Sequence, residues 1–186
     1  PRLKAMIAFM HASMHASVES IRQYLESVMG LKVSDGTVDN AIRAGGDGLA
    51  QADAELLAAL PKEASVHVDE TGHYRNGKLL WCWIFVAKQY SIIRTGLSRK
   101  AEVLLGMLGT LFDGLIHSDY YGAYRRFKKW AQAARFQFCL AHLVRDLKFL
   151  AEHPSDIAKA WGKGMLTLIR KMLQARQNGA NSKEVE

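Results

Sequence analysis

The chain has 186 residues, an apolar fraction of 49% and a formal net charge of +7, so it is long enough for one substantial core or two small ones and basic enough to suggest a polyanionic partner. It contains no apolar run of the roughly 20 residues that a membrane span needs and no secretory leader, so we expect a cytoplasmic protein without a membrane partner. Two cysteines are too few for a disulfide scaffold and indicate a reducing compartment.

Helices are predicted throughout the first 60 residues. Apolar side chains recur there every three or four positions, as they do on one face of an amphipathic helix. Ser34 or Asp35 can cap the third of these helices, and the glycine-rich segment 45–48 predicts its end. The predicted helices span residues 3–14, 18–28, 35–42 and 49–60.

Residues 18–43 have the layout of a helix-turn-helix, a motif that places a recognition helix on DNA. Their only cations are Arg22, Lys32 and Arg43, and the segment is slightly acidic overall. A helix that reads DNA is expected to be basic. We therefore favour helix packing or subunit pairing as the role of this segment.

After Pro61 the apolar spacing changes to the period of two that strands show. Val66 and Val68 alternate with polar residues, and the Asn76-Gly77 pair is a strong signal for a hairpin turn. Strands are predicted over 65–69, 79–87, 90–95, 114–119 and 134–139. Helices are predicted over 98–108, with Ser98 as the cap, over 120–131, and from Leu140 onward with a break at Pro154.

Three hairpin-linked strands followed by alternating helices and strands predict an α/β fold with a mixed sheet. This is the order of the ribonuclease-H-like fold, in which the first and fourth strands lie side by side and parallel. We expect three parts. They are a helical region over 1–62 that includes the candidate helix-turn-helix, part of a ribonuclease-H-like core over 63–139, and the start of a helical insertion with a polar C-terminal tail over 140–186.

Two of the predicted strands end in an aspartate. SVHVDETG puts Asp69 at the end of an alternating run, and LIHSDYYGAY puts Asp119 at the end of a short apolar run. If the two strands are neighbours, the carboxylates lie close together, and their repulsion favours a cation between them. Mg²⁺ and Mn²⁺ prefer such oxygen ligands, and pairs of these ions promote phosphodiester chemistry. Spacing alone leaves open a simpler role, in which both are loop aspartates that cap strands or helices.

Three blocks of the sequence resemble the core of an IS66-type insertion-sequence transposase, a bacterial branch of the DDE transposases. The blocks are VHVDETGHYRNGKLLWCWIFVA, SDYYGAYRRF and FCLAHLVRDLKFLAE. They occur in the family's order over most of residues 64–152, and the preceding helices resemble the family's N-terminal region. The resemblance implies that Asp69 and Asp119 are the first two catalytic acids and metal ligands, with two Mg²⁺ or Mn²⁺ ions in the full active site.

The same resemblance implies a function, which is Mg²⁺-dependent cleavage and strand transfer of double-stranded DNA at element ends and target, carried out by a homo-oligomer. The family's third acid is a glutamate in a later block without a match here, since Glu152, Glu184 and Glu186 stand in no such motif. We therefore expect a fragment that ends inside the insertion and that folds but does not cut or join DNA alone. The alternatives are a ribonuclease-H-like nuclease without strand transfer and a non-catalytic DNA-binding or assembly module.

Cys139 and His142 form a C-x-x-H motif. Two ligands fall short of the four that structural zinc usually takes, and no second pair stands at a fitting spacing. We favour a structural role, in which the motif packs the insertion against the sheet, and metal binding is the alternative.

His67 and His117 each precede a candidate aspartate by two residues, so strand geometry puts each imidazole on the face of its aspartate. There the imidazole can orient the carboxylate through a hydrogen bond. The simpler alternative is a pair of half-buried histidines.

Positive charge is concentrated in the second part of the chain. Residues 1–63 carry 6 Lys and Arg against 8 Asp and Glu, whereas residues 64–186 carry 19 against 10. We expect a cluster after Asp119 to hold the DNA backbone through salt-sensitive, sequence-independent contacts, and the alternative is a solvated helix face. The cations concerned are Arg125, Arg126, Lys128, Lys129 and Arg145.

Overall fold

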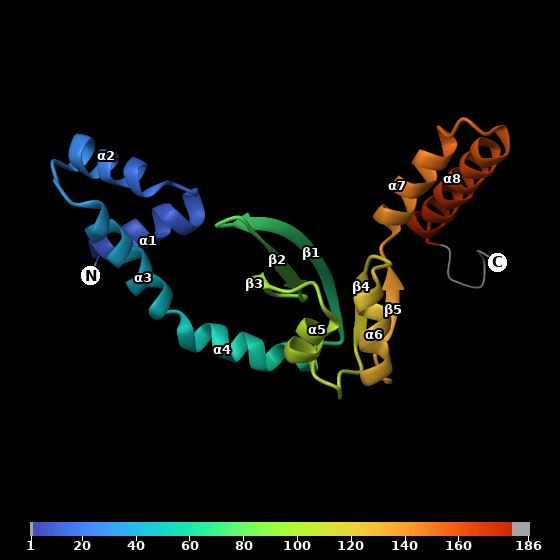
Figure 1. Cartoon of the computed structure of the whole chain (residues 1–186), viewed down its shortest axis with the longest axis horizontal. Helices are drawn as coiled ribbons and strands as arrows, with labels where there is room; N and C mark the ends of the chain where they lie inside the picture. The colour runs from blue at the N-terminus through green and yellow to red at the C-terminus, as the bar shows by residue number, and fades with distance from the viewer. Residues whose placement is uncertain (1, 180–186) are drawn as a thin grey trace. The chain divides into compact units, whose positions relative to one another are not determined.

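A computed structural model describes residues 2–179 of the chain, which divides into two compact units, Pro1–Leu60 and Pro61–Glu186. The described part contains eight α-helices and one mixed sheet of five strands, so the fold is α/β as predicted (Figure 1). Within residues 2–179, no helix combines the length and the apolar composition that crossing a bilayer requires.

The first unit is helical. It consists of α1 (Arg2–Met14), α2 (Val18–Met29), α3 (Asp35–Asp47) and α4 (Ala50–Ala59), followed by a short 3₁₀ turn at Leu60–Lys62. Ser17 and Ser34 cap α2 and α3, because each hydroxyl accepts a hydrogen bond from the backbone N–H three residues further on. The core of this unit is formed by Ile7, Met10, Ile21, Leu25, Val38 and Ala41.

The cations of the helix-turn-helix segment are engaged with acids of the same unit. Arg22 Nε lies 3.1 Å from Asp35 Oδ1 and so joins α2 to α3. Lys32 lies 3.7 Å from Glu26, and an Arg43–Asp39 pair within α3 has a distance of 2.8 Å. This arrangement leaves little net positive charge on the segment and fits a packing role better than contact with a phosphate backbone.

α3 ends inside the glycine-rich segment, as predicted, but only after two of its glycines. The helix continues through Gly45 and Gly46 and ends at Asp47. A Cβ atom at Gly45 would lie only 2.6 Å from the Cβ of Ala8 in α1, whereas a Cβ at Gly46 would meet no atom within 4 Å. Gly45 therefore allows α1 and α3 to pack closely.

The second unit is built on a sheet with the strand order β3-β2-β1-β4-β5. The strands are β1 (Ser65–Arg75), β2 (Lys78–Val86), β3 (Ser91–Leu97), β4 (Leu115–Ser118) and β5 (Arg135–Phe138). The first three are linked by antiparallel pairing, while β4 runs parallel to β1 and β5 runs parallel to β4. The predicted parallel neighbourhood of the first and fourth strands is confirmed, with His67 opposite His117.

The first hairpin is longer than the sequence pattern predicts. β1 extends to Arg75, which pairs with Lys78 across the turn. Asn76 and Gly77 both have positive φ, at 51° and 72°, as a tight two-residue hairpin turn requires. The turn prediction is therefore confirmed, and the strand continues right up to it.

Two helices, α5 (Ala101–Leu108) and α6 (Gly122–Trp130), belong to the same unit and pack beside each other. The hydroxyl of Tyr124 in α6 reaches the carbonyl of Val68, and its ring lies 6.2 Å from that of Trp83, so α6 covers one face of the sheet. The buried residues there include Val66, Val68, Trp83, Phe85, Leu104, Ile116, Tyr124 and Phe127.

The predicted cap of α5 is wrong. The helix begins at Ala101 with Lys100 at the cap position and no side-chain cap, and the Ser98 hydroxyl instead accepts a hydrogen bond from the Lys100 N–H at 3.4 Å.

After β5, α7 (Leu140–Ala151) and α8 (Asp156–Gln177) form an antiparallel pair around Leu147, Leu166 and Ile169 (Figure 1). Glu184 and Glu186 lie outside the described residues.

Candidate active site

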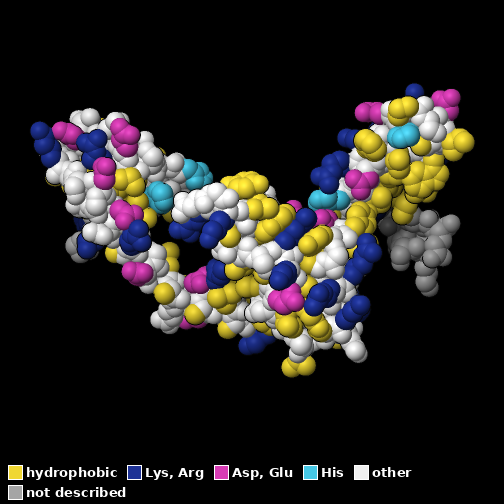
Figure 2. All heavy atoms as spheres, viewed as in Figure 1, with side chains coloured by type: hydrophobic (Ala, Val, Ile, Leu, Met, Phe, Trp, Pro, Cys, Tyr) yellow, Lys and Arg dark blue, Asp and Glu magenta, His cyan; other side chains and the backbone are white. Residues whose placement is uncertain are grey.

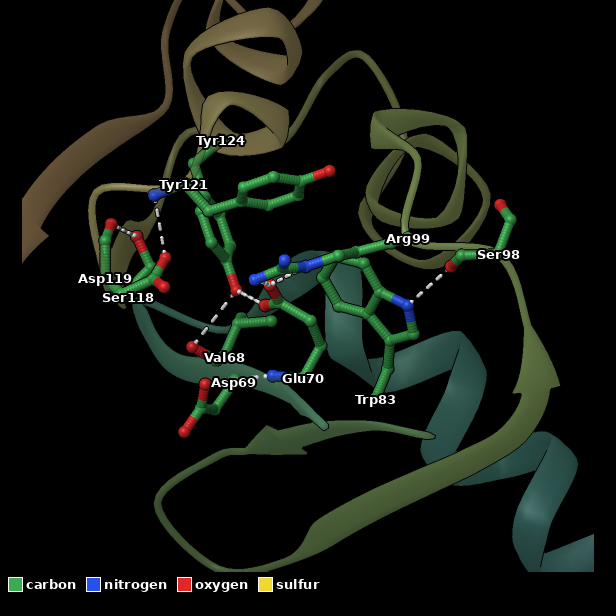
Figure 3. Close-up of polar contacts among 10 residues, drawn as sticks. All are labelled: Val68, Asp69, Glu70, Trp83, Ser98, Arg99, Ser118, Asp119, Tyr121 and Tyr124. Atoms are coloured by element: carbon green, nitrogen blue, oxygen red, sulfur yellow. Dashed lines mark hydrogen bonds and ion pairs between the residues drawn. The ribbon is translucent and has the colours of Figure 1, made fainter. Parts of the chain in front are cut away.

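Asp69 and Asp119 occupy corresponding positions on two neighbouring strands. Asp69 lies within β1, Asp119 directly follows β4, and each comes two residues after a member of the paired His67 and His117. Both aspartates line one cavity of about 620 Å³. Figure 3 shows the Asp69 carboxylate pointing away from Glu70 and Arg99. Strands that are distant in sequence therefore bring two acids to the same cavity.

Backbone N–H groups orient both carboxylates. Asp69 Oδ1 accepts from the Glu70 N–H at 2.9 Å, and Asp119 Oδ1 accepts from the Tyr121 N–H at 2.8 Å, just before α6 begins. In the part of the chain that the structure describes, neither carboxylate forms a salt bridge. Both negative charges remain available to a cation.

The donor set suits a hard divalent cation, because two unpaired carboxylates face one open cavity and such ions prefer oxygen ligands. It is an incomplete set of protein ligands, however. Over residues 2–179, no group of three His, Cys, Asp or Glu side chains is placed to hold a metal ion. Glu152 follows the last turn of α7 and is not among the residues that line the cavity.

The two histidines form a stacked pair on the wall of this cavity. Their ring centroids are 4.2 Å apart with an angle of 10° between the planes. Burial lowers the pKa of His117, and the nearby His67 lowers it further, which favours a neutral imidazole there. The predicted hydrogen bond to a carboxylate is not the one observed, since His117 Nε2 is 3.0 Å from the Ser65 hydroxyl.

Glu70, which the sequence analysis did not identify, belongs to a buried polar network with Arg99 and Tyr124 (Figure 3). Its side chain is only 1% exposed. Glu70 Oε1 accepts from Arg99 Nε at 3.0 Å, and Oε2 accepts from the Tyr124 hydroxyl at 2.7 Å. Burial raises the pKa of Glu70, although the hydrogen bonds from Tyr124 and Arg99 oppose that shift. The pKa of Tyr124 is raised by its own burial and by Glu70.

Arg99 is held between two aromatic rings. Its guanidinium carbon lies 4.3 Å from the ring of Trp81 and 3.9 Å from the ring of Tyr121. The loop that carries Arg99 is fixed in turn, because Trp83 Nε1 donates to the Ser98 carbonyl at 2.9 Å. Tyr121 also supplies the N–H that orients Asp119, so the network connects the backbones next to both aspartates.

A sequence signal for Glu70 was present. Val66, Val68 and Glu70 alternate along β1, so the period of two puts the glutamate on the apolar face. A carboxylate on such a face needs hydrogen-bonding or charged partners to offset the cost of burial. Nothing in the sequence identified Arg99 and Tyr124 as those partners.

The C-x-x-H motif borders the same cavity. Cys139 and His142 both line it, and the Cys139 N–H donates to the Ser118 carbonyl at 2.7 Å, which ties the start of α7 to the end of β4. Both cysteines are free thiols, and a hydrogen bond with His142 lowers the pKa of Cys139.

The candidate DNA-binding cations differ in their surroundings. Arg126 pairs with Glu102 at 3.5 Å, and the Lys128 ammonium donates to the carbonyls of Gln132 and Ala134 at the end of α6. Arg125 reaches the Tyr120 carbonyl at 3.3 Å, while Lys129 and Arg145 are exposed. Lys128 therefore has a structural contact in addition to its charge.

The family model described as Transposase IS66 family matches residues 1–186. The chain belongs to the IS66 family of transposases. The family resemblance that the sequence predicts is thereby confirmed.

Two further comparisons add little to the IS66 assignment. No curated protein matches the chain. Among solved structures, it is similar to a chain in a cryo-EM structure of the simian T-cell lymphotropic virus intasome in complex with PP2A regulatory subunit B56 gamma, with 13% identity and a TM-score of 0.34. That match covers 84% of this chain and 66% of the other, so the chain spans just under two thirds of its neighbour's length.

Proposed function

We propose that this IS66 chain supplies two acids of a DDE-type active site that cleaves and joins DNA. The observation that carries the proposal is the placement of Asp69 and Asp119 on parallel neighbouring strands, lining one cavity, without a salt-bridge partner among residues 2–179. Membership of a transposase family supports DNA as the substrate.

A ribonuclease-H-like core is part of the proposal. Three antiparallel strands are followed by two parallel ones, and the strand that carries Asp69 is central in the sheet. This order supports the assignment, because it puts the first and fourth strands side by side.

Asp69 and Asp119 would hold Mg²⁺ or Mn²⁺, two ions in a full site, and such ions when bound activate an attacking oxygen and stabilise charge on the phosphate. The chain's own residues prepare the site for this. Backbone N–H groups orient the two carboxylates, and the Glu70–Arg99–Tyr124 network fixes β1, the loop before α5 and α6 relative to one another. Such preorganisation limits reorganisation during the reaction.

The proposed substrate is double-stranded DNA, at element ends and target, and the proposed active form is a homo-oligomer. Lys and Arg side chains gather over α6 and β5 (Figure 2), next to the segment that carries Asp119. These charges would hold phosphates without reading sequence. Arg125, Lys128, Lys129 and Arg145 are the exposed members of the predicted set that form no salt bridge with an acid within residues 2–179.

The third acid of the active site is absent from the cavity formed by the described residues. We therefore propose that residues 1–186 alone bind DNA and metal but do not catalyse strand transfer. A strand-transfer assay with this chain, Mg²⁺ and a supercoiled target checks this, and robust formation of joined product would contradict it.

Catalytic roles are tested in a transposase polypeptide that contains residues 1–186 and is active in a transposition assay. Asp69→Asn and Asp119→Asn should each reduce joined product by about a hundredfold or more, because each removes one charge from the metal site. Asp113→Asn is the matched control, since Asp113 is exposed and does not line the cavity, and it should leave activity unchanged.

The incomplete acid set also supports a second candidate, a non-catalytic DNA-binding or assembly module. In that case both Asn variants would retain transposition. Cleaved product without joined product would instead indicate a nuclease that does not transfer strands.

A further inference from the structure

A second cavity of the same unit lies between α6 and β5 and has a volume of about 450 Å³. Its apolar wall includes Phe136 and Phe138, which alternate on one face of β5. Its cations are Arg125, Lys128 and Arg135, and no acid is among the residues that line it. We call this cavity the α6–β5 groove.

An aromatic pair stands where the α6–β5 groove meets the candidate active site. Phe138 lines both cavities. Its ring centroid lies 4.7 Å from that of Tyr120, with an angle of 42° between the planes, and Tyr120 directly follows Asp119. Phe138 is 41% exposed, so part of its ring is open to a ligand.

The cations of the groove are placed for a phosphate. Arg125 and Arg135 are both exposed. Arg125 lies on α6, and Arg135 is the first residue of β5. The Arg125 guanidinium reaches the Tyr120 carbonyl at 3.3 Å, which holds it near the aromatic pair. Figure 2 shows this concentration of Lys and Arg side chains over α6 and β5.

We propose that the α6–β5 groove binds an unpaired nucleotide of the DNA strand, with the base against Phe138 and Tyr120 and the phosphate between Arg125 and Arg135. The inference rests on the proposed function for its choice of DNA as ligand. Exposed aromatic rings beside a row of cations suit single-stranded nucleic acid, because every base offers a face for stacking while cations follow the backbone. A paired base has its faces covered by its neighbours, so the groove selects a nucleotide that has left the duplex. Because Phe138 lines both the groove and the candidate active-site cavity, a nucleotide bound there would lie next to the phosphate that is cleaved or joined.

Binding to oligonucleotides tests the proposal with the chain as it is. Fluorescence anisotropy would compare a labelled ten-nucleotide oligothymidylate, an abasic oligomer of the same length and a ten-base-pair duplex, at one fixed salt concentration. Phe138→Leu should weaken binding of oligothymidylate roughly tenfold and change binding of the abasic oligomer and the duplex less than about twofold. Arg135→Gln should weaken binding of all three, because it removes a phosphate contact.

Phe149→Leu is the matched control, because Phe149 is a 71% exposed phenylalanine on α7 outside both cavities. It should bind all three probes as the unaltered chain does. Circular dichroism of each variant separates loss of contact from loss of fold.

The proposal is overturned if Phe138→Leu binds oligothymidylate as tightly as the unaltered chain, or weakens the duplex and the abasic oligomer to the same extent. It is also overturned if the unaltered chain binds none of the probes. A different result would contradict the proposed function. If the Asp69→Asn and Asp119→Asn variants still transpose, the two aspartates are not catalytic, whatever the oligonucleotide affinities are.

Discussion

Glu70 stands in the same DET segment as Asp69, yet its surroundings give it another role. Its carboxylate is turned into the core, where Arg99 and Tyr124 satisfy it, whereas the Asp69 carboxylate lines the cavity. A buried charge with well-placed partners contributes little net stability, but removal of one partner leaves the other unsatisfied. Glu70 therefore acts on the site through position, by holding the backbone next to Asp69.

Glu70→Gln keeps the shape of the side chain and removes its charge. We expect the free energy of unfolding of the second unit to fall by about 1–3 kcal/mol, with part of the loss screened because Arg99 is 37% exposed. Glu102→Gln is the control. The side chains of Glu102 and Arg126 are 52% and 64% exposed, so their salt bridge should contribute less than about 1 kcal/mol to the free energy of unfolding. Urea unfolding followed by tryptophan fluorescence reports this unit selectively, because all four tryptophans lie within Pro61–Glu186. Equal midpoints for the two variants would contradict the role given to Glu70.

Cys139 has a pKa lowered by its hydrogen bond with His142, so a larger fraction is thiolate near neutral pH than for an ordinary cysteine. Iodoacetamide should therefore alkylate Cys139 severalfold faster than Cys82, which is also partly exposed. The difference should shrink as the pH rises toward the ordinary thiol pKa, and His142→Ala should remove it. Peptide mass spectrometry measures both rates, and faster alkylation of Cys82 would contradict the assignment.

At this scale the sequence indicated that Asp69 and Asp119 would lie close together, because each ends a predicted strand, but it did not indicate the buried network beside them. The partners of Glu70 come from the loop before α5 and from α6, so no local pattern links them to β1. Strand period put each histidine on the face of its aspartate. The stacking of the two rings and the hydrogen bond of His117 to Ser65 depend on the register of β1 against β4.

At the scale of elements, periodicity located the helices and strands, and close contacts decided where some of them end. β1 runs to Arg75 because the Asn-Gly turn closes the hairpin without a loop. α3 continues through two glycines because packing against α1 outweighs their weak helix propensity, a contact that no short window of sequence contains.

Gly45 and Gly46 provide a matched pair for this point. Gly45→Ala should destabilise the first unit by about 1–3 kcal/mol, because the added Cβ would approach Ala8 to 2.6 Å. Gly46→Ala meets open space in the same helix and should be neutral or stabilising by up to about 1 kcal/mol. Thermal unfolding followed by far-ultraviolet circular dichroism compares the two, and equal effects would mean that α1 and α3 do not pack as described.

At the scale of the whole chain, element order predicted the α/β class and the parallel pairing of β1 with β4, since hairpins and crossovers leave few ways to arrange such a sheet. The sequence did not give a complete set of metal ligands. Asp69, Asp119 and the C-x-x-H motif at the start of α7 line the cavity, and no third carboxylate of the described residues lines it. The proposed metal site therefore rests on two carboxylates that line one cavity beside a basic surface.

The most direct test of this account is Mn²⁺ binding by calorimetry to the chain, its Asp69→Asn, Asp119→Asn and double variants, and an Asp113→Asn control. If both carboxylates hold one ion, each single variant should weaken Mn²⁺ affinity by about tenfold or more, and the double variant should lose little beyond that, because the two effects are coupled. Asp113→Asn should bind as the unaltered chain does. Mn²⁺ affinity that survives either single substitution, or losses that simply add in the double variant, would contradict a shared site.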